Sequence, residues 1–98
     1  MTHESRNREV VTVTVPVIDG LPTMKAYNGM VVAAQGWAAK WTLDDNARTV
    51  TLTGQRVDVD WVLARATARR IFEKRVAADA ITSARPAKSL DVIVEVAR

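Results

Sequence analysis

The sequence predicts an α+β fold, a single domain in which an antiparallel β-meander of five to six strands packs on one long α-helix and ends in a C-terminal strand. Asp19-Gly20 and Asn28-Gly29 lie between Val-rich stretches. Such dipeptides favour two-residue hairpins because both turn residues adopt positive φ. Apolar and polar side chains then alternate over residues 11–59, and a helical periodicity follows.

A meander through these turns places Val13, Val15 and Val17 on one face of the sheet, opposite Ala26, Met24 and Pro22. A slip of one residue would exchange the two faces, so the alternation itself defines the register. The parity continues past a bend at Gln35-Gly36, through a turn at 44–47, to a short strand at 57–59. The predicted inner face holds Trp37, Ala39, Trp41, Leu43, Val50, Leu52, Val57 and Val59, and the outer face Thr12, Thr14, Thr42, Thr49, Thr51 and Thr53.

A long helix is predicted to begin at Trp61, because Asp60 is a favourable N-cap and the apolar period changes there from two to about 3.5. Residues 84–88 connect this helix to a predicted last strand at 90–97. The helix is expected to bury Trp61, Ala64, Ala68, Ile71, Phe72 and Val76 against the sheet, which leaves Val62, Leu63 and Ala66 on its outer side.

The alternative is the βαββαβ order of ferredoxin-like folds, in which residues 23–35 form a helix. Met24, Tyr27, Val31 and Ala34 would then lie on one stripe. This order places Asn28-Gly29 and two adjacent valines inside the helix, which costs on the order of 1–2 kcal/mol relative to good helix formers. The meander is therefore the preferred prediction.

Composition indicates one domain over residues 9–98, because 98 residues with 48% hydrophobic content can bury one core. Residues 1–8 are predicted to form a flexible polar tail. The ten arginines against four lysines are typical of a GC-rich genome, such as those of actinobacteria and their phages. No apolar run is long enough to span a bilayer. We therefore expect a cytoplasmic protein with no membrane partner.

The sequence contains no recognisable catalytic or cofactor-binding motif, so the protein is predicted not to be an enzyme. The one His is His3, in the predicted tail, and the absence of Cys excludes disulfides and thiolate ligands. The four glycines are dispersed and form no phosphate-binding loop. Asp44-Asp45 and Asp58/Asp60 are interpreted as a turn, an outward strand residue and a helix cap, so no metal or small-molecule cofactor is predicted.

Two binding surfaces compete as the functional prediction. The net charge is +3 with a pI near 9.8, and Arg69, Arg70 and Lys74 share the outward half of the predicted helix, where they would attract DNA or another nucleic acid. The other candidate is a protein-contact surface, which we favour: either the apolar patch of Val62, Leu63 and Ala66 on the helix or the flat sheet face with Thr49 and Thr51. We therefore predict a non-catalytic protein-interaction module that forms a homodimer or binds another protein.

Overall fold

The computed structural model describes residues 9–82 and 85–86. The predicted tail at 1–8 and the predicted strand at 90–97 lie outside these residues. Along the described chain the elements are β1 (Val10–Pro16), α2 (Thr23–Ala33), β2 (Lys40–Asp44), β3 (Thr49–Gln55), α3 (Arg56–Ala68), α4 (Lys74–Thr82) and β4 (Arg85–Pro86). They form a small α+β domain, as predicted, but not the predicted meander.

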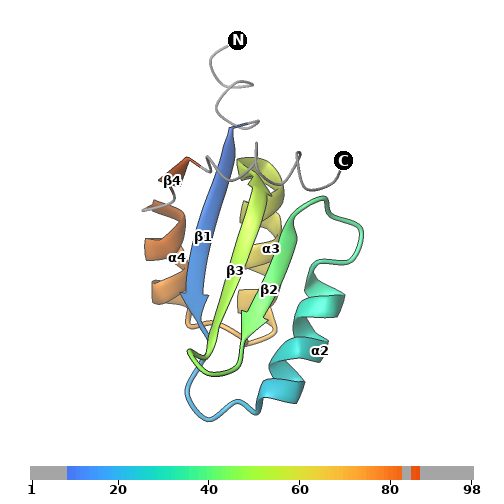
Figure 1. Cartoon of the computed structure of the whole chain (residues 1–98), viewed down its shortest axis with the longest axis vertical. Coiled ribbons are helices and arrows are strands. Elements are labelled where there is room, and N and C mark those ends of the chain that lie inside the picture. The colour runs from blue at the N-terminus through green and yellow to red at the C-terminus, as the bar shows by residue number, and fades with distance from the viewer. Residues whose placement is uncertain (1–8, 83–84, 87–98) are drawn as a thin grey trace.

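The strands form one antiparallel sheet in the order β2-β3-β1-β4. Figure 1 shows α3 behind the sheet, with α2 on the side of β2 and α4 on the side of β1. The helices therefore leave the other face of the sheet open to the viewer. The strand order and the helix between β1 and β2 agree with the βαββαβ alternative, except that two helices stand where that arrangement has one.

The predicted parity of β1 and β3 is confirmed, although their pairing differs from the meander. Val13 lies opposite Leu52 and Val15 opposite Val50, with all four side chains in the interior. β1 therefore pairs with β3, a segment about 40 residues away, rather than with the segment that follows it. Alternation fixes which side chains face inward but carries no information about which strand is the neighbour.

The predicted hairpin at Asn28-Gly29 is wrong, because both residues lie inside α2. The helix buries Ala26, Met30 and Ala33, which recur at helical spacing, whereas the stripe expected for the alternative is largely exposed. Gly29 is favoured inside this helix by a close approach: a Cβ there would lie 2.7 Å from Cδ1 of Ile71. A turn does form at Asp19-Gly20, with Gly20 at φ +86°, and it leads into α2 rather than into a strand.

The predicted single helix is two helices. Of its predicted buried residues, Ile71 and Phe72 are buried, whereas Trp61, Ala64 and Ala68 are exposed. The first, α3, begins at Arg56 instead of Trp61, so residues 57–59 are helical rather than a strand. Arg70 adopts φ +63° and interrupts the helical path before α4 begins. Ile71 and Phe72 enter the interior from this connection. The buried residues of α3 are Val59, Val62, Leu63 and Ala66.

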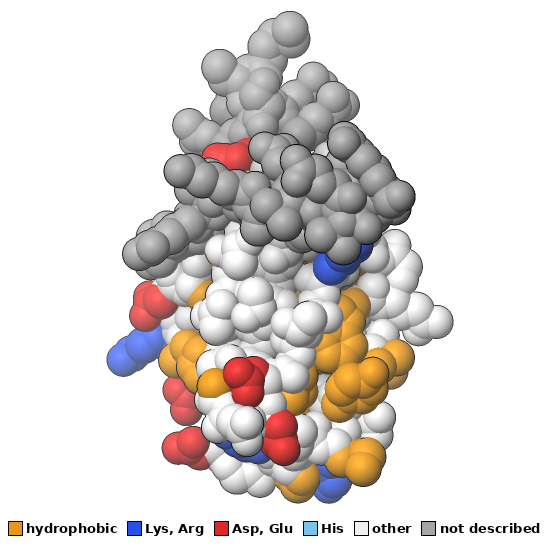
Figure 2. Space-filling view, in the orientation of Figure 1, with side chains coloured by type: hydrophobic (Ala, Val, Ile, Leu, Met, Phe, Trp, Pro, Cys, Tyr) orange, Lys and Arg blue, Asp and Glu red, His pale blue; other side chains and the backbone are white. Residues whose placement is uncertain are grey.

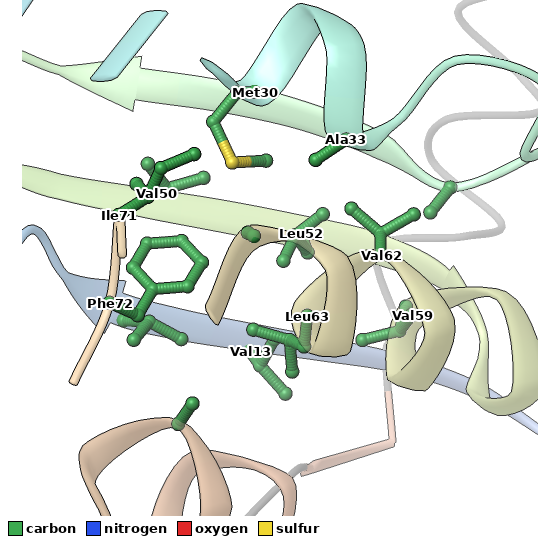
Figure 3. Packing of buried hydrophobic residues seen from close by; sticks show 14 of the residues in the cluster. Val13, Met30, Ala33, Val50, Leu52, Val59, Val62, Leu63, Ile71 and Phe72 are labelled. Atoms are coloured by element: carbon green, nitrogen blue, oxygen red, sulfur yellow. The ribbon is translucent and has the colours of Figure 1, made fainter. Parts of the chain in front are cut away.

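The interior is built from aliphatic side chains and one phenylalanine (Figure 3). The predicted burial of the tryptophans is wrong: Trp37 and Trp41 are half-buried, and Trp61 is 53% exposed. The buried cluster in the described residues comprises Val11, Val13, Val15, Val17, Ala26, Met30, Ala33, Ala39, Val50, Leu52, Val59, Val62, Leu63, Ala66, Ile71, Phe72 and Ala77.

Candidate functional site

The predicted contact residues on the helix are not available as a surface. Val62, Leu63 and Ala66 are all fully buried, so their predicted exposure is wrong. The predicted face joined Trp61 to Val76 as one helix, whereas the helical path is interrupted at Arg70 and α3 by itself packs the side with Val59, Val62, Leu63 and Ala66 inward. Thr49 and Thr51 do lie on the outer face of the sheet, as predicted, where both are half-buried.

The open sheet face is a regular array of threonines. Thr12 and Thr53 lie opposite each other with their Oγ1 atoms 3.2 Å apart, and Thr14 and Thr51 form a second pair at 3.0 Å. In the part of this face that Figure 2 does not draw in grey, most side chains are uncharged, acidic side chains lie at the lower end and along the left, and apolar side chains lie on both flanks, with more of them on the side of α2. Within each of these two cross-strand pairs the hydroxyls are hydrogen-bonded to one another.

Four aromatic side chains form two ring pairs on or beside the α2–β2 segment. Tyr27 of α2 meets Trp41 of β2 edge to face, with centroids 5.1 Å apart. Trp37, in the connection between these elements, stacks on Trp61 of α3 at 5.6 Å and an interplanar angle of 11°. All four side chains are partly exposed.

The exposed side of α2 extends this surface. Met24, Tyr27 and Val31 are 72%, 52% and 49% exposed and follow one another at helical spacing along one side of the helix. A row of large apolar side chains left in water is uncommon on a small protein unless something binds there. We call the combined surface the aromatic edge, comprising Met24, Tyr27, Val31, Trp37, Trp41 and Trp61.

The three basic candidates are exposed but do not share a helix face. Arg69 caps the C-terminus of α3, Arg70 lies in the connection, and Lys74 begins α4. Arg69 lines a shallow hollow of about 400 Å³ together with Lys25 of α2. Arg70 and Lys74 instead line a separate groove of about 660 Å³ between α3 and α4. The cluster predicted from sequence is thus divided between two hollows.

The groove between α3 and α4 is largely apolar. Leu63, Ala68, Phe72 and Ala77 contribute to its walls, and Glu73 lies among the residues that line it with the two basic side chains. Apolar walls offer hydrophobic contact but neither a nucleophile with a base nor a set of metal ligands. The groove therefore supports no specific chemistry.

Asp60, in the N-terminal part of α3, is a carboxylate whose pKa is clearly shifted. Burial raises the pKa of Asp60 above its ordinary value, and the positive charge of Arg56 partly opposes the shift. Arg56 also forms an ion pair with Glu9 at 3.5 Å, while its Nε is buried without a hydrogen-bond partner among the described residues. Asp60 lines neither of the two hollows. These charges anchor the start of α3 and do not converge on a cavity.

Comparison with family models, curated proteins and solved structures gave no match to this chain. Among the described helices, none has the length and apolar character required to cross a membrane. Residues 9–82 and 85–86 bring together no group of three or more side chains suited to hold a metal ion.

The aromatic edge was missed at the sequence level, although its signal was present. The spacing of Met24, Tyr27 and Val31 is that of one helix side. The preferred meander placed Met24 and Val31 on the inner face of a sheet and Tyr27 on its outer face, so it did not bring the three side chains together. Only the packing of α2 shows that Ala26, Met30 and Ala33 face inward instead.

Proposed function

We propose that this protein is a non-catalytic protein-interaction module whose partner binds at the aromatic edge. The observation that carries the proposal is the position of the tryptophan and tyrosine side chains. All three tryptophans and the one tyrosine are partly exposed and lie in the two ring pairs, while the buried cluster contains none of them. Tryptophan and tyrosine are the residues most enriched among those that contribute most to binding at protein interfaces.

The ring pairs also favour binding by being organised in advance. Tyr27 is held against Trp41, and Trp61 against Trp37, so these side chains lose little rotamer freedom when a partner covers them. Apolar surface that folding leaves in water contributes about 25 cal/mol per Å² when a partner buries it. The edge thus supplies both a driving force and a low entropic cost.

The other parts of the proposal come from the sequence. The absence of Cys and the position of the one His at His3 support a non-catalytic role without a cofactor. The composition supports a cytoplasmic location. Exposure of Arg69, Arg70 and Lys74 supports the nucleic-acid alternative. These side chains line two separate hollows and do not form one basic surface, so we favour the aromatic edge as the binding site.

A double variant of α2 tests the proposal. Tyr27→Ser with Val31→Ser removes two exposed members of the aromatic edge without changing a buried residue. Lys25→Ser, an exposed position of the same helix outside the edge, is the matched control. Sedimentation velocity measures self-association, and affinity purification followed by titration with each purified candidate measures other partners. We expect the double variant to weaken binding at least tenfold, roughly the effect of losing one strong interface residue.

Equal binding by the double variant and the control would contradict the aromatic edge as the binding surface. Complete absence of association would contradict an interaction role. Fluorescence anisotropy with duplex and single-stranded probes at low salt addresses the alternative. Micromolar binding that is lost in the Arg69→Ala, Arg70→Ala, Lys74→Ala triple variant would favour a nucleic-acid binder instead.

A further inference from the structure

One side of β2 is unpaired within the described sheet. β3 pairs with one side of β2, and no other described strand pairs with the opposite side, where β2 ends the strand order (Figure 1). An edge strand presents free N–H and C=O groups that can pair with another strand, and proteins usually block such edges with proline, bulges or charges. The sequence of β2, Lys-Trp-Thr-Leu-Asp, contains no proline and carries one charge of each sign.

From this strand we infer that the partner at the aromatic edge is a second copy of the chain, bound by antiparallel pairing of β2 with β2 about a twofold axis at Thr42. The inference rests on the proposed function and specifies its partner. Under this symmetry Lys40 of one copy lies opposite Asp44 of the other, and Trp41 lies opposite Leu43. The two sheets would join into one continuous sheet.

Charge complementarity selects both the direction and the register. Lys40 and Asp44 are exposed on the open face, opposite Thr53 and Thr49 of β3. Neither forms an ion pair within the described residues, and Oδ1 of Asp44 accepts a hydrogen bond from the backbone N–H of Ala47. The antiparallel pairing centred on Thr42 forms two ion pairs across the axis. An in-register parallel pairing would instead place like charges side by side, which is destabilising.

The opposite face of β2 supplies the apolar half of the interface. Trp41 and Leu43 are only half-buried there, although they point to the helical side of the sheet. In the inferred register each indole covers the leucine of the other copy, and Tyr27, which contacts Trp41 edge to face, extends the contact toward α2. A register slip by one residue would exchange the faces and lose both the ion pairs and this apolar contact.

A charge-swap experiment on the full-length chain tests the inferred pairing. Lys40→Asp and Asp44→Lys each place like charges opposite each other in a homodimer, so each variant alone should raise the dimer dissociation constant by roughly 30-fold. An equimolar mixture of the two variants pairs opposite charges again and should recover dimers in sedimentation velocity. The double variant Lys40→Asp with Asp44→Lys should also dimerise with itself, while mixing poorly with the wild type.

Lys25→Asp is the control, since it makes the same charge change as Lys40→Asp at an exposed position of α2. Circular dichroism establishes that each variant is folded. A wild-type chain that is monomeric at 200 μM, or single variants that dimerise like the control, would overturn the β2 pairing. The proposed function is judged separately: it stands if association of any kind is lost in the Tyr27→Ser, Val31→Ser variant, and falls if that variant associates normally.

Discussion

Apolar side chains are buried in the interior beneath β1 and β3, but they stay in contact with water at the aromatic edge beside β2. In the interior, Val15, Val50 and Leu63 have no exposed surface, and the side chains are mostly aliphatic. At the edge, Trp61 and Tyr27 keep about half of their surface in water. The difference teaches that apolar character alone does not decide burial in this fold. Stability is expected to depend on the buried residues, among them Phe72, Met30 and Leu52, and association on the tryptophans and the tyrosine of the aromatic edge.

Close packing limits which side chains fit in parts of the interior. A Cβ on Gly54 would lie 3.0 Å from the Cα of Ala39, so the backbone segments there are already in tight contact. α3 likewise presents Ala66 to the interior with no exposed surface. Interiors are packed as densely as molecular crystals, and an indole in such a layer would force the layers apart.

The largest expected effect on stability comes from a carboxylate in the interior, compared with a carboxylate at the aromatic edge on the same helix, α3. Leu63→Glu introduces a carboxylate at a fully buried position of α3 and should lower the free energy of unfolding by about 4 kcal/mol or abolish folding. Trp61→Glu, two residues earlier at an exposed position, should cost about 1 kcal/mol, mainly through the lost stacking on Trp37. Urea denaturation followed by circular dichroism measures both. Equal losses would remove the distinction between interior and edge.

A pair of glycine substitutions sharpens the description of the interior. Gly54→Ala should lower the free energy of unfolding by about 2 kcal/mol, because the new methyl group meets the backbone of Ala39. Gly29→Ala meets only the flexible end of Ile71 and gains helix propensity of about 1 kcal/mol, so its net effect should stay within about 1 kcal/mol of zero. Thermal denaturation of the two variants compares them. The reverse order would show that the side chain of Ile71 cannot move away from a methyl group on residue 29.

The smallest effect is expected on the open sheet face, which belongs to neither region. Thr14→Val and Thr51→Val each remove one hydroxyl of a pair 3.0 Å apart. Each change should alter the free energy of unfolding by less than about 0.5 kcal/mol, with a coupling below about 1 kcal/mol in a double-mutant cycle. Urea denaturation of the four proteins of the cycle measures it. A loss above about 2 kcal/mol would mean that this face contributes as strongly as the interior.

Part of the fold was predictable because strand alternation is a local property. The inward positions of Val13, Val15, Val50 and Leu52 follow from a period of two and agree with the structure. The segment around Asn28-Gly29 was not predictable in the same way. Its dipeptide favours a turn, and the helix that forms instead buries Ala26, Met30 and Ala33. Tertiary packing overrides a propensity of about 1–2 kcal/mol.

The candidate site was likewise predictable only in part. The outward position of Thr49 and Thr51 and the exposure of Arg69, Arg70 and Lys74 agree with the sequence interpretation. The exposed patch predicted at Leu63 was wrong, because the predicted buried face ran from Trp61 to Val76 along one continuous helix. In the structure the helical path is interrupted at Arg70, so Ile71 and Phe72 do not share a helix face with Trp61 and Ala64. A helical period fixes relative positions on a helix but not which side meets the sheet.

By itself the sequence determined a single small α+β domain, the parity of its strands and a chemistry without thiols or a central histidine, since these depend on residue type and nearest neighbours. Only the tertiary structure decided that β1 lies between β3 and β4, that residues 23–33 are helical and that the tryptophans and the tyrosine lie outside the interior. The physical reason is that pairing and burial are settled by contacts between distant segments. Small local preferences yield to the larger free energy of forming one close-packed interior.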